Sequence, residues 1–209
     1  MIKVGLTGNL GGGKTFVSKI FETKGVPVYN CDNRSKWLIL NNPELISKIK
    51  EEFGENIYEG ESVFKNISKI AFVEGSKEKL HILMKLISPY FDTDLESFYQ
   101  KNKDEKFCLV ESAILYEYNM EENLDKVIYV TASEETRLKR AMDRDGMSPE
   151  DYRIRMQNQI NFAEKIKRSE FIIYNDGRTM EELNYEVNYI YNHYYSNNLN
   201  TMPYKAYKL

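Results

Sequence analysis

The chain has 209 residues, enough for one domain with a hydrophobic core of normal size, or for one domain with insertions. Its formal net charge of −3 at pH 7 gives no general reason to expect a nucleic acid or a membrane surface as a partner, so a basic site has to be local. Two cysteines, Cys31 and Cys108, are too few for a disulfide framework, and no long apolar segment follows a basic N-terminus, so we expect a cytoplasmic protein with reduced, buried thiols.

Short apolar segments alternate with helical patterns along the chain. The segments that read as strands are 2–7, 26–30, 107–111, 126–131 and 171–174. Because helical patterns separate them, we predict an α/β fold with a parallel five-stranded sheet flanked by helices on both faces.

The phosphate loop, residues 8–15, reads GNLGGGKT and joins the first predicted strand to the first predicted helix. Its Gly8, Gly13, Lys14 and Thr15 satisfy G-x-x-x-x-G-K-[ST], the pattern in which backbone N–H groups wrap a polyphosphate. Lysine in this pattern reaches the β- and γ-phosphates, and the threonine hydroxyl ligates Mg²⁺. The alternative is a glycine-rich turn with a solvated lysine.

We predict that the phosphate loop and the residue after it bind the nucleotide. These residues are Gly8, Asn9, Leu10, Gly11, Gly12, Gly13, Lys14, Thr15 and Phe16. Gly11 and Gly12 exceed what the pattern requires, which suits a close approach of the loop to its anion. The chain is short for a motor and has no Asn-Lys-x-Asp signature for guanine, so a small-molecule kinase is favoured over a GTPase or a transport ATPase.

Asp32 follows the second predicted strand, at the carboxyl end of a parallel sheet, where open α/β folds bind ligands. A carboxylate at this place can accept the proton of an attacking hydroxyl or orient that hydroxyl. The alternative is a helix N-cap for Asn33 onward.

Residues 33–105 contain several helical patterns and are too long for a simple crossover between strands. One pattern runs from Leu80 to Ile87, pauses at Ser88-Pro89 and resumes at Phe91. We interpret the segment as a helical insertion that forms a substrate pocket; a purely structural helical layer is the alternative.

Two helices joined by a turn are predicted over 133–144 and 149–167. Ser133 and Ser148 precede them as caps, and Asp145-Gly146 separates them. A further amphipathic helix is predicted over 180–195, and we assign no function to the tail beyond it.

Basic residues concentrate in the segment 137–168, which holds nine Lys or Arg and five Asp or Glu and so carries a net charge of +4. Its Arg137, Arg140 and Arg144 recur at helical spacing and share one face. Such a face on a movable element can close over a polyphosphate and exclude water. The alternative is a solvated face paired with nearby acids.

Six blocks, in this order and spacing, resemble the dephospho-coenzyme A kinase family over nearly all of residues 2–177. They are GLTGNLGGGKT, PVYNCD, ESAILYE, VIYVTASEETRLKRAMDRDG, RMQNQ and FIIYNDG. The resemblance implies a P-loop kinase fold that uses ATP and Mg²⁺ to phosphorylate the ribose 3′-hydroxyl of dephospho-CoA, the last step of CoA biosynthesis. The implied partners are ATP and dephospho-CoA, with no nucleic acid, no membrane and no obligate protein partner.

The resemblance also implies roles for single residues. The family has a D-x-D pair whose second member matches Asp32, whereas Asn30 replaces the first, so the acceptor role falls to Asp32 alone. The implied catalytic residues are Asp32, Lys14, Arg140 and Arg144. Glu111 occupies an acidic position that supports Mg²⁺ through water, unless it simply begins the next helix.

Further matches are Gln159, Glu164 and Lys165 in the lid, Glu117 without a role, and Asn175 with Gly177 in an N-x-G turn beside the adenine. A plain capping turn is the alternative for the last pair. The implied division is one kinase domain over 1–209. Its parts are a core (about 1–32, 106–132 and 169–195), a CoA-binding insertion (about 33–105) and a lid (about 137–168).

Two other functions stay open. A nucleoside monophosphate kinase shares the fold and the lid. Departures from the family pattern at Asn30, Ser88 and Ala113 leave room for a nucleotide-responsive binding protein that has lost catalysis.

Overall fold

Two units with separate hydrophobic cores make up the computed structural model, which describes residues 1–60, 62–71, 77–157 and 159–196. Unit 1 contains Met1–Asn30 and the chain from Asn102 onward, and unit 2 is Cys31–Lys101. The tail 197–209, to which we assigned no function, lies outside the described residues.

Unit 1 is built on a parallel sheet whose five strands lie where the apolar segments predicted them. They are β1 (Ile2–Gly8), β2 (Val28–Asn30), β3 (Phe107–Glu111), β4 (Lys126–Thr131) and β5 (Phe171–Tyr174). Their order is β2-β3-β1-β4-β5, and every neighbouring pair is parallel. All strands therefore end at one edge of the sheet, with β1 between β3 and β4, so the phosphate loop leaves the sheet at its centre.

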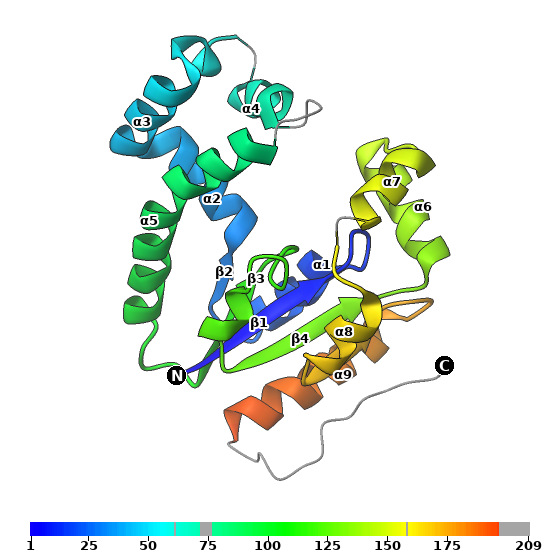
Figure 1. Ribbon diagram of the computed structural model, residues 1–209. Helices are drawn as coiled ribbons and strands as arrows, with labels where there is room; N and C mark the ends of the chain where they lie inside the picture. Colours follow the sequence, from blue (N-terminus) through cyan, green and yellow to red (C-terminus); the bar gives the residue numbers. More distant parts are fainter. Residues whose placement is uncertain (61, 72–76, 158, 197–209) are drawn as a thin grey trace. The chain divides into compact units, whose positions relative to one another are not determined.

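The other elements described in unit 1 are helices. They are α1 (Lys14–Glu22), η2 (Met120–Asn123), α6 (Glu134–Asp145), α7 (Pro149–Gln157), α8 (Phe162–Lys167) and α9 (Met180–Tyr195). Figure 1 shows α1 and α9 on the sheet and α6 and α7 beyond its edge, next to the loop between β1 and α1.

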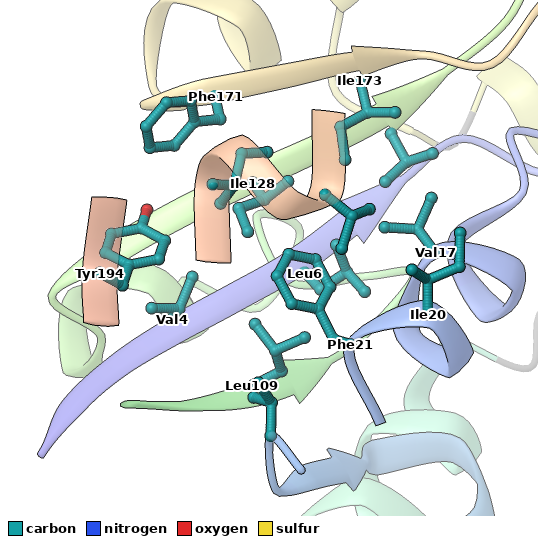
Figure 2. Close-up of a cluster of buried hydrophobic side chains, with 14 of the residues drawn as sticks. Val4, Leu6, Val17, Ile20, Phe21, Leu109, Ile128, Phe171, Ile173 and Tyr194 are labelled. Carbon is teal, nitrogen blue, oxygen red and sulfur yellow. The ribbon is translucent and has the colours of Figure 1, made fainter. Parts of the chain in front are cut away.

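The main core lies between the sheet and the helices α1 and α9. Strand residues such as Leu6 and Ile128 meet Phe21 of α1 and Tyr194 of α9 there (Figure 2). On the other face Val127 packs with Leu115, and the Tyr129 ring lies 5.9 Å from that of Phe162 in α8, measured between centroids. Because successive strand residues point to opposite faces, β4 supplies both layers.

Both serines that the sequence predicts as helix caps accept a backbone hydrogen bond. Ser133 Oγ accepts a hydrogen bond from the Thr136 N–H at 3.3 Å, and Ser148 Oγ accepts one from Asp151 at 3.1 Å. Gly146 ends α6 in the left-handed conformation, with φ of 62°.

The single helix predicted over 149–167 is wrong. The structure has two helices, α7 and α8, because Asn161 begins a new helix by accepting the Ala163 N–H with its side chain at 2.9 Å. Asparagine at this position offers the backbone an alternative to a continuous helix.

The elements of unit 2 that the structure describes are all helices. They are α2 (Cys31–Asn41), α3 (Pro43–Phe53), η1 (Glu55–Tyr58), α4 (Val63–Ala71) and α5 (Lys77–Lys101). The predicted pause at Ser88-Pro89 is wrong, since α5 continues through Pro89. A proline in a helix interior costs about 3 kcal/mol, because it removes a backbone hydrogen bond and its ring clashes with the preceding turn. Burial of Leu83 and Ile87 in the core of unit 2 offsets this cost.

Both cysteines are buried thiols, and burial raises the pKa of Cys108 to about 11. Among the described helices, none combines the length and the apolar character needed to cross a membrane.

Candidate active site

The phosphate loop connects the central strand β1 to helix α1, as the sequence predicted. Gly11 and Gly13 have positive φ angles of 78° and 95°. The Gly12 N–H donates to the Asn9 carbonyl at 2.9 Å and closes the loop. Since the first turn of an α-helix leaves its N–H groups without intrahelical acceptors, the start of α1 aims donors and a partial positive charge at the loop.

The glycines of the phosphate loop allow two other segments, β4 and α6, to approach it. A Cβ atom on Gly8 would lie 2.1 Å from the Val130 carbonyl oxygen, and one on Gly12 would lie 2.8 Å from the same atom. A Cβ on Gly11 would lie 2.3 Å from the Arg137 carbonyl oxygen, in α6. We interpreted the two extra glycines as clearance for an anion; the structure shows that they also provide clearance for β4 and α6.

Glu111 joins the phosphate loop to β2. Thr15 Oγ1 donates to Glu111 Oε1 at 3.1 Å, and Asn30 Nδ2 donates to Glu111 Oε2 at 3.0 Å. Glu111 is the last residue of β3, in register with Asn30 of β2 and Leu6 of β1, so the alternative that it begins a helix is wrong.

Oxygen atoms of the Thr15 hydroxyl and the Glu111 carboxylate lie side by side here, and such oxygens are the ligands that Mg²⁺ prefers. Among the described residues, no group of three or more His, Cys, Asp or Glu could hold a metal ion. At phosphate sites, one or two protein oxygens suffice for Mg²⁺, because water and phosphate complete its shell. The residues present therefore fit this ion.

Lys14 begins α1, and its Nζ donates to the Gly8 carbonyl at 3.3 Å, so the side chain folds back over the phosphate loop. Phe16, in the first turn of the helix, is partly exposed. Leu10 instead packs with the lid, against Ala141 and Tyr152.

Asp32 belongs to unit 2, as the second residue of α2. Its Oδ2 accepts a hydrogen bond from Lys36 Nζ at 2.7 Å, and its side chain is 75% exposed. Because Asp32 lies inside the first turn, it is not the N-cap that the alternative interpretation required. Exposed pairs of this kind contribute about 0–1 kcal/mol, so the carboxylate can exchange its lysine partner readily.

Arg140 and Arg144, to which the resemblance assigns catalytic roles, have different surroundings. Arg140 Nη1 donates to the Gly11 carbonyl at 3.3 Å, so this guanidinium lies at the phosphate loop. Arg144 instead pairs with the carboxylate of Asp145, with its Nε 2.8 Å and its Nη2 2.7 Å from the two oxygens. This pairing raises the pKa of Arg144 and lowers that of Asp145. Arg144 is therefore paired with a nearby acid, as the alternative of a solvated, acid-paired face predicts.

The turn after β5 contacts the phosphate loop from a third side. Asn175 Nδ2 donates to the Gly12 carbonyl at 3.2 Å. The family resemblance implies that this amide lies beside the adenine, whereas in the structure it is bonded to the phosphate loop. Gly177, with φ of 62°, permits the turn.

Asp176, between these two, is a residue that the sequence argument did not identify. Its carboxylate accepts the Ser133 N–H at 3.1 Å and the Thr136 hydroxyl, and hydrogen bonds from Ser133 and Thr136 lower its pKa. It thereby attaches the turn to the start of α6. The available signal was an aspartate in an N-D-G turn, where such side chains commonly bond backbone N–H groups.

Asn9 connects the phosphate loop with the base of the lid. This residue is 3% exposed; its Nδ2 donates to Gln159 Oε1 at 2.8 Å, and its Oδ1 accepts the Tyr129 hydroxyl. Burial raises the pKa of Tyr129 to about 12, so the hydroxyl is a donor at neutral pH. The side chain of Asn9 therefore has a structural contact, while its backbone belongs to the loop.

A buried ion pair anchors the last helix of the lid. The side chain of Lys165 is fully buried, with Nζ 3.0 Å from Glu117 Oε1, and the same oxygen accepts the Ile160 N–H at 3.1 Å. Glu117, which had no role from the sequence, thus holds α8 against the segment that follows β3.

Comparisons with known proteins identify relatives of this chain. The family model for dephospho-CoA kinase matches residues 2–181. A dephospho-CoA kinase of Porphyromonas gingivalis is 35% identical over 159 residues, covering 76% of this chain and 78% of that protein.

Solved structures show the same fold. A dephospho-CoA kinase from Campylobacter jejuni has a TM-score of 0.67 and 26% identity, covering 94% of this chain and 98% of that one. A shikimate kinase from Acinetobacter baumannii, only 15% identical, covers 95% of this chain and 96% of its own with a TM-score of 0.53, and shows the fold alone. The predicted P-loop kinase fold is therefore confirmed. By the extent of these matches, the chain belongs to the dephospho-CoA kinase family of phosphoryl-transferring enzymes.

Proposed function

We propose that this protein transfers the γ-phosphoryl group of ATP to the ribose 3′-hydroxyl of dephospho-CoA, giving CoA and ADP with Mg²⁺ as the cofactor of ATP. Its family catalyses ATP-dependent phosphorylation of dephospho-CoA, the last step of CoA biosynthesis. The observation that carries the proposal is the hydrogen bond between Thr15, at the end of the phosphate loop, and the buried carboxylate of Glu111.

On the donor side, the backbone N–H groups of the phosphate loop and the ammonium of Lys14 would hold the β- and γ-phosphates. Thr15 would hold Mg²⁺, with Glu111 bound to it through water. An Mg²⁺ ion held there would supply positive charge that stabilises the negative charge developing during transfer.

Arg140, which already contacts the phosphate loop, would bring a guanidinium to the transferring group. Arg144 would have to leave Asp145 to do the same. We therefore rank Arg140 above Arg144 as a phosphate contact, and we propose that 137–168 closes as a lid.

On the acceptor side, Asp32 would accept the proton of the ribose hydroxyl or orient that hydroxyl toward the γ-phosphate. Its exposed carboxylate and weak pairing with Lys36 support this role. We propose that unit 2 is the acceptor-binding insertion of a single kinase domain, and that the protein acts in the cytoplasm, where its reduced thiols persist.

A coupled ADP-release assay tests the proposal. The purified protein is given ATP and Mg²⁺ with dephospho-CoA or with each nucleoside monophosphate in turn, and the wild type is compared with Asp32→Asn. We expect turnover with dephospho-CoA alone, a new 3′-phosphate in the ³¹P NMR spectrum, and a kcat for the variant lower by about 10²- to 10⁴-fold with unchanged ATP affinity.

Two results would contradict this. Turnover with a nucleoside monophosphate and none with dephospho-CoA would make the protein an ordinary nucleotide kinase. Tight ATP binding without turnover on any acceptor would make it a nucleotide-responsive binding protein.

A further inference from the structure

Asn30 is the last residue of β2, and its register partner is Glu111, the last residue of β3. Its side-chain Nδ2 donates a hydrogen bond to Glu111 Oε2 at 3.0 Å. The reaction as proposed gives Asn30 no task, so the contact of its amide with this carboxylate needs an explanation of its own.

The carboxylate of Glu111 is held from two sides. Glu111 is only 5% exposed; its Oε1 accepts the Thr15 hydroxyl at 3.1 Å, and its Oε2 accepts the Asn30 amide. The last torsion of a glutamate side chain has a broad energy profile, so a donor on one oxygen alone leaves the carboxylate able to rotate. A donor on each oxygen fixes its plane.

The orientation of Glu111 decides where the proton of the Thr15 hydroxyl points. A carboxylate only accepts hydrogen bonds, so the proton of their contact belongs to Thr15. A hydroxyl has one proton and two lone pairs, and only the lone pairs can bind a cation. Because Thr15 is exposed and gives its proton to the buried carboxylate, its lone pairs remain for an ion at the phosphate loop.

Contacts one step removed from a metal ion control its binding. Groups that hydrogen-bond the ligands of a metal orient those ligands, and the loss of one such group lowers metal affinity or activity by about 10- to 100-fold. Mg²⁺ demands near-ideal octahedral geometry and takes few ligands from the protein at phosphate sites. The orientation of Thr15 and Glu111 is therefore a large part of what the protein can supply.

We propose that Asn30 is a positioning residue for the divalent cation that accompanies the nucleotide. Its amide fixes Glu111, and Glu111 holds the Thr15 hydroxyl with its lone pairs toward the ion. The inference rests on the proposed function and extends it to a residue that acts only through another. The cation affinity of the nucleotide complex is then set in part from β2.

Binding of Mn²⁺ to the complex with ADP tests the inference without turnover. Mn²⁺ takes the same oxygen ligands as Mg²⁺, and the electron paramagnetic resonance signal of unbound Mn²⁺ gives its dissociation constant. Asn30→Leu keeps the size of the side chain and removes the donor. We expect this variant to bind Mn²⁺ about 10- to 100-fold more weakly, while its affinity for ADP without metal stays within about twofold of the wild type.

Asn184→Leu is the matched control. Asn184 Nδ2 donates to the Met180 carbonyl at 2.9 Å within α9, so the same change removes a side-chain hydrogen bond that involves neither the phosphate loop nor β3. Its Mn²⁺ affinity should equal that of the wild type.

The dependence of turnover on Mg²⁺ gives a second readout. Asn30→Leu should need about 10- to 100-fold more Mg²⁺ for half-maximal turnover, and excess Mg²⁺ should recover most of the lost rate. A purely structural effect would instead lower kcat and Tm without moving the Mg²⁺ requirement. Asn30→Ala provides a second, smaller replacement in case Asn30→Leu does not fold.

A double-mutant cycle with Glu111→Gln separates positioning from a direct effect of the amide. If Asn30 acts through Glu111, Asn30→Leu should change the Mn²⁺ affinity little once Glu111→Gln is present. An undiminished effect in that background would overturn the inference, because Asn30 would then act without Glu111.

Wild-type Mn²⁺ affinity in Asn30→Leu and Asn30→Ala would also overturn the inference, and it would leave the proposed function intact. Absence of any turnover of dephospho-CoA by the wild type would instead refute the proposed function. The Mn²⁺ titration, which uses ADP alone, would still decide the role of Asn30.

Discussion

At the scale of single residues, Gly11 shows why the phosphate loop needs glycine beyond its pattern. Its φ of 78° is strained for any other residue, and a Cβ there would lie 2.3 Å from the Arg137 carbonyl oxygen. Two separate costs therefore apply at one position, the backbone conformation and the approach of α6.

We predict that Gly11→Ala destabilises the protein by about 2–4 kcal/mol and raises the KM for ATP, since the variant must bear strain and push α6 from the loop. Gly25→Ala is the matched control, with φ of 80° and no atom within 4 Å of the added Cβ, and should cost only about 1–2 kcal/mol with no change in KM. Urea denaturation and steady-state kinetics measure both effects. Equal losses in the two variants would show that α6 yields without cost.

At the scale of elements, the segment 137–168, which we propose closes as a lid, is attached at both ends. Asp176 holds the start of α6, while Asn9 and Glu117 hold the chain around Gln159 and Ile160. Closure of a lid attached in this way has to occur between these ends, in α6 and α7.

Asp176 makes the first attachment dependent on pH. The Ser133 and Thr136 hydrogen bonds lower the pKa of the Asp176 carboxyl from its ordinary value of 3.8. The ionised carboxylate therefore stabilises the folded protein at every pH above about 4. This stabilisation is lost as the pH falls below about 4 and passes through the lower pKa of the folded state. We predict that Asp176→Asn is less stable than the wild type by roughly 1 kcal/mol at pH 7, and that the difference shrinks below pH 4. Thermal unfolding at several pH values measures this, and a difference independent of pH would contradict it.

The second attachment depends on burial. We predict that Lys165→Met destabilises the protein by about 3–5 kcal/mol because Glu117 is left as an uncompensated charge, and that adding Glu117→Gln restores part of the loss. Lys167→Met, at an exposed lysine of the same helix, should stay within about 0.5 kcal/mol of the wild type. Denaturation of the wild type, Lys165→Met, Glu117→Gln and the double variant gives the coupling energy, and additive losses would show that the pair is not coupled.

At the scale of the whole molecule, two units share the chain, and we expect the two substrates to affect them separately. We predict that ATP with Mg²⁺ slows amide hydrogen exchange in the phosphate loop, α6 and α7, whereas dephospho-CoA slows it in α2. Exchange in α9, which packs on the sheet, serves as the internal reference. Protection of the loop without any change in α6 and α7 would mean that the lid does not close over the nucleotide.

Local patterns predicted the strands and the phosphate loop because both depend on neighbouring residues: a short apolar run forms a strand, and a fixed spacing of glycine and lysine forms the loop. The missed features depend on distant partners. Lys165 meets Glu117, and Asn175 meets Gly12, only through the fold. The continuous α5 was missed for the same reason, since burial of its apolar side outweighs the local effect of Pro89.

The bond between Asn30 and Glu111 alters the electrostatics of the enzyme at rest. The D-x-D pair of the family would place a second carboxylate at position 30. It would face Glu111 at close range, since Asn30 Nδ2 now lies 3.0 Å from Glu111 Oε2. Two carboxylates so close need a shared proton or a cation to coexist. With asparagine there, the Glu111 carboxylate accepts a hydrogen bond and faces no second negative charge at position 30, so the order of this contact in the absence of substrate should not depend on magnesium.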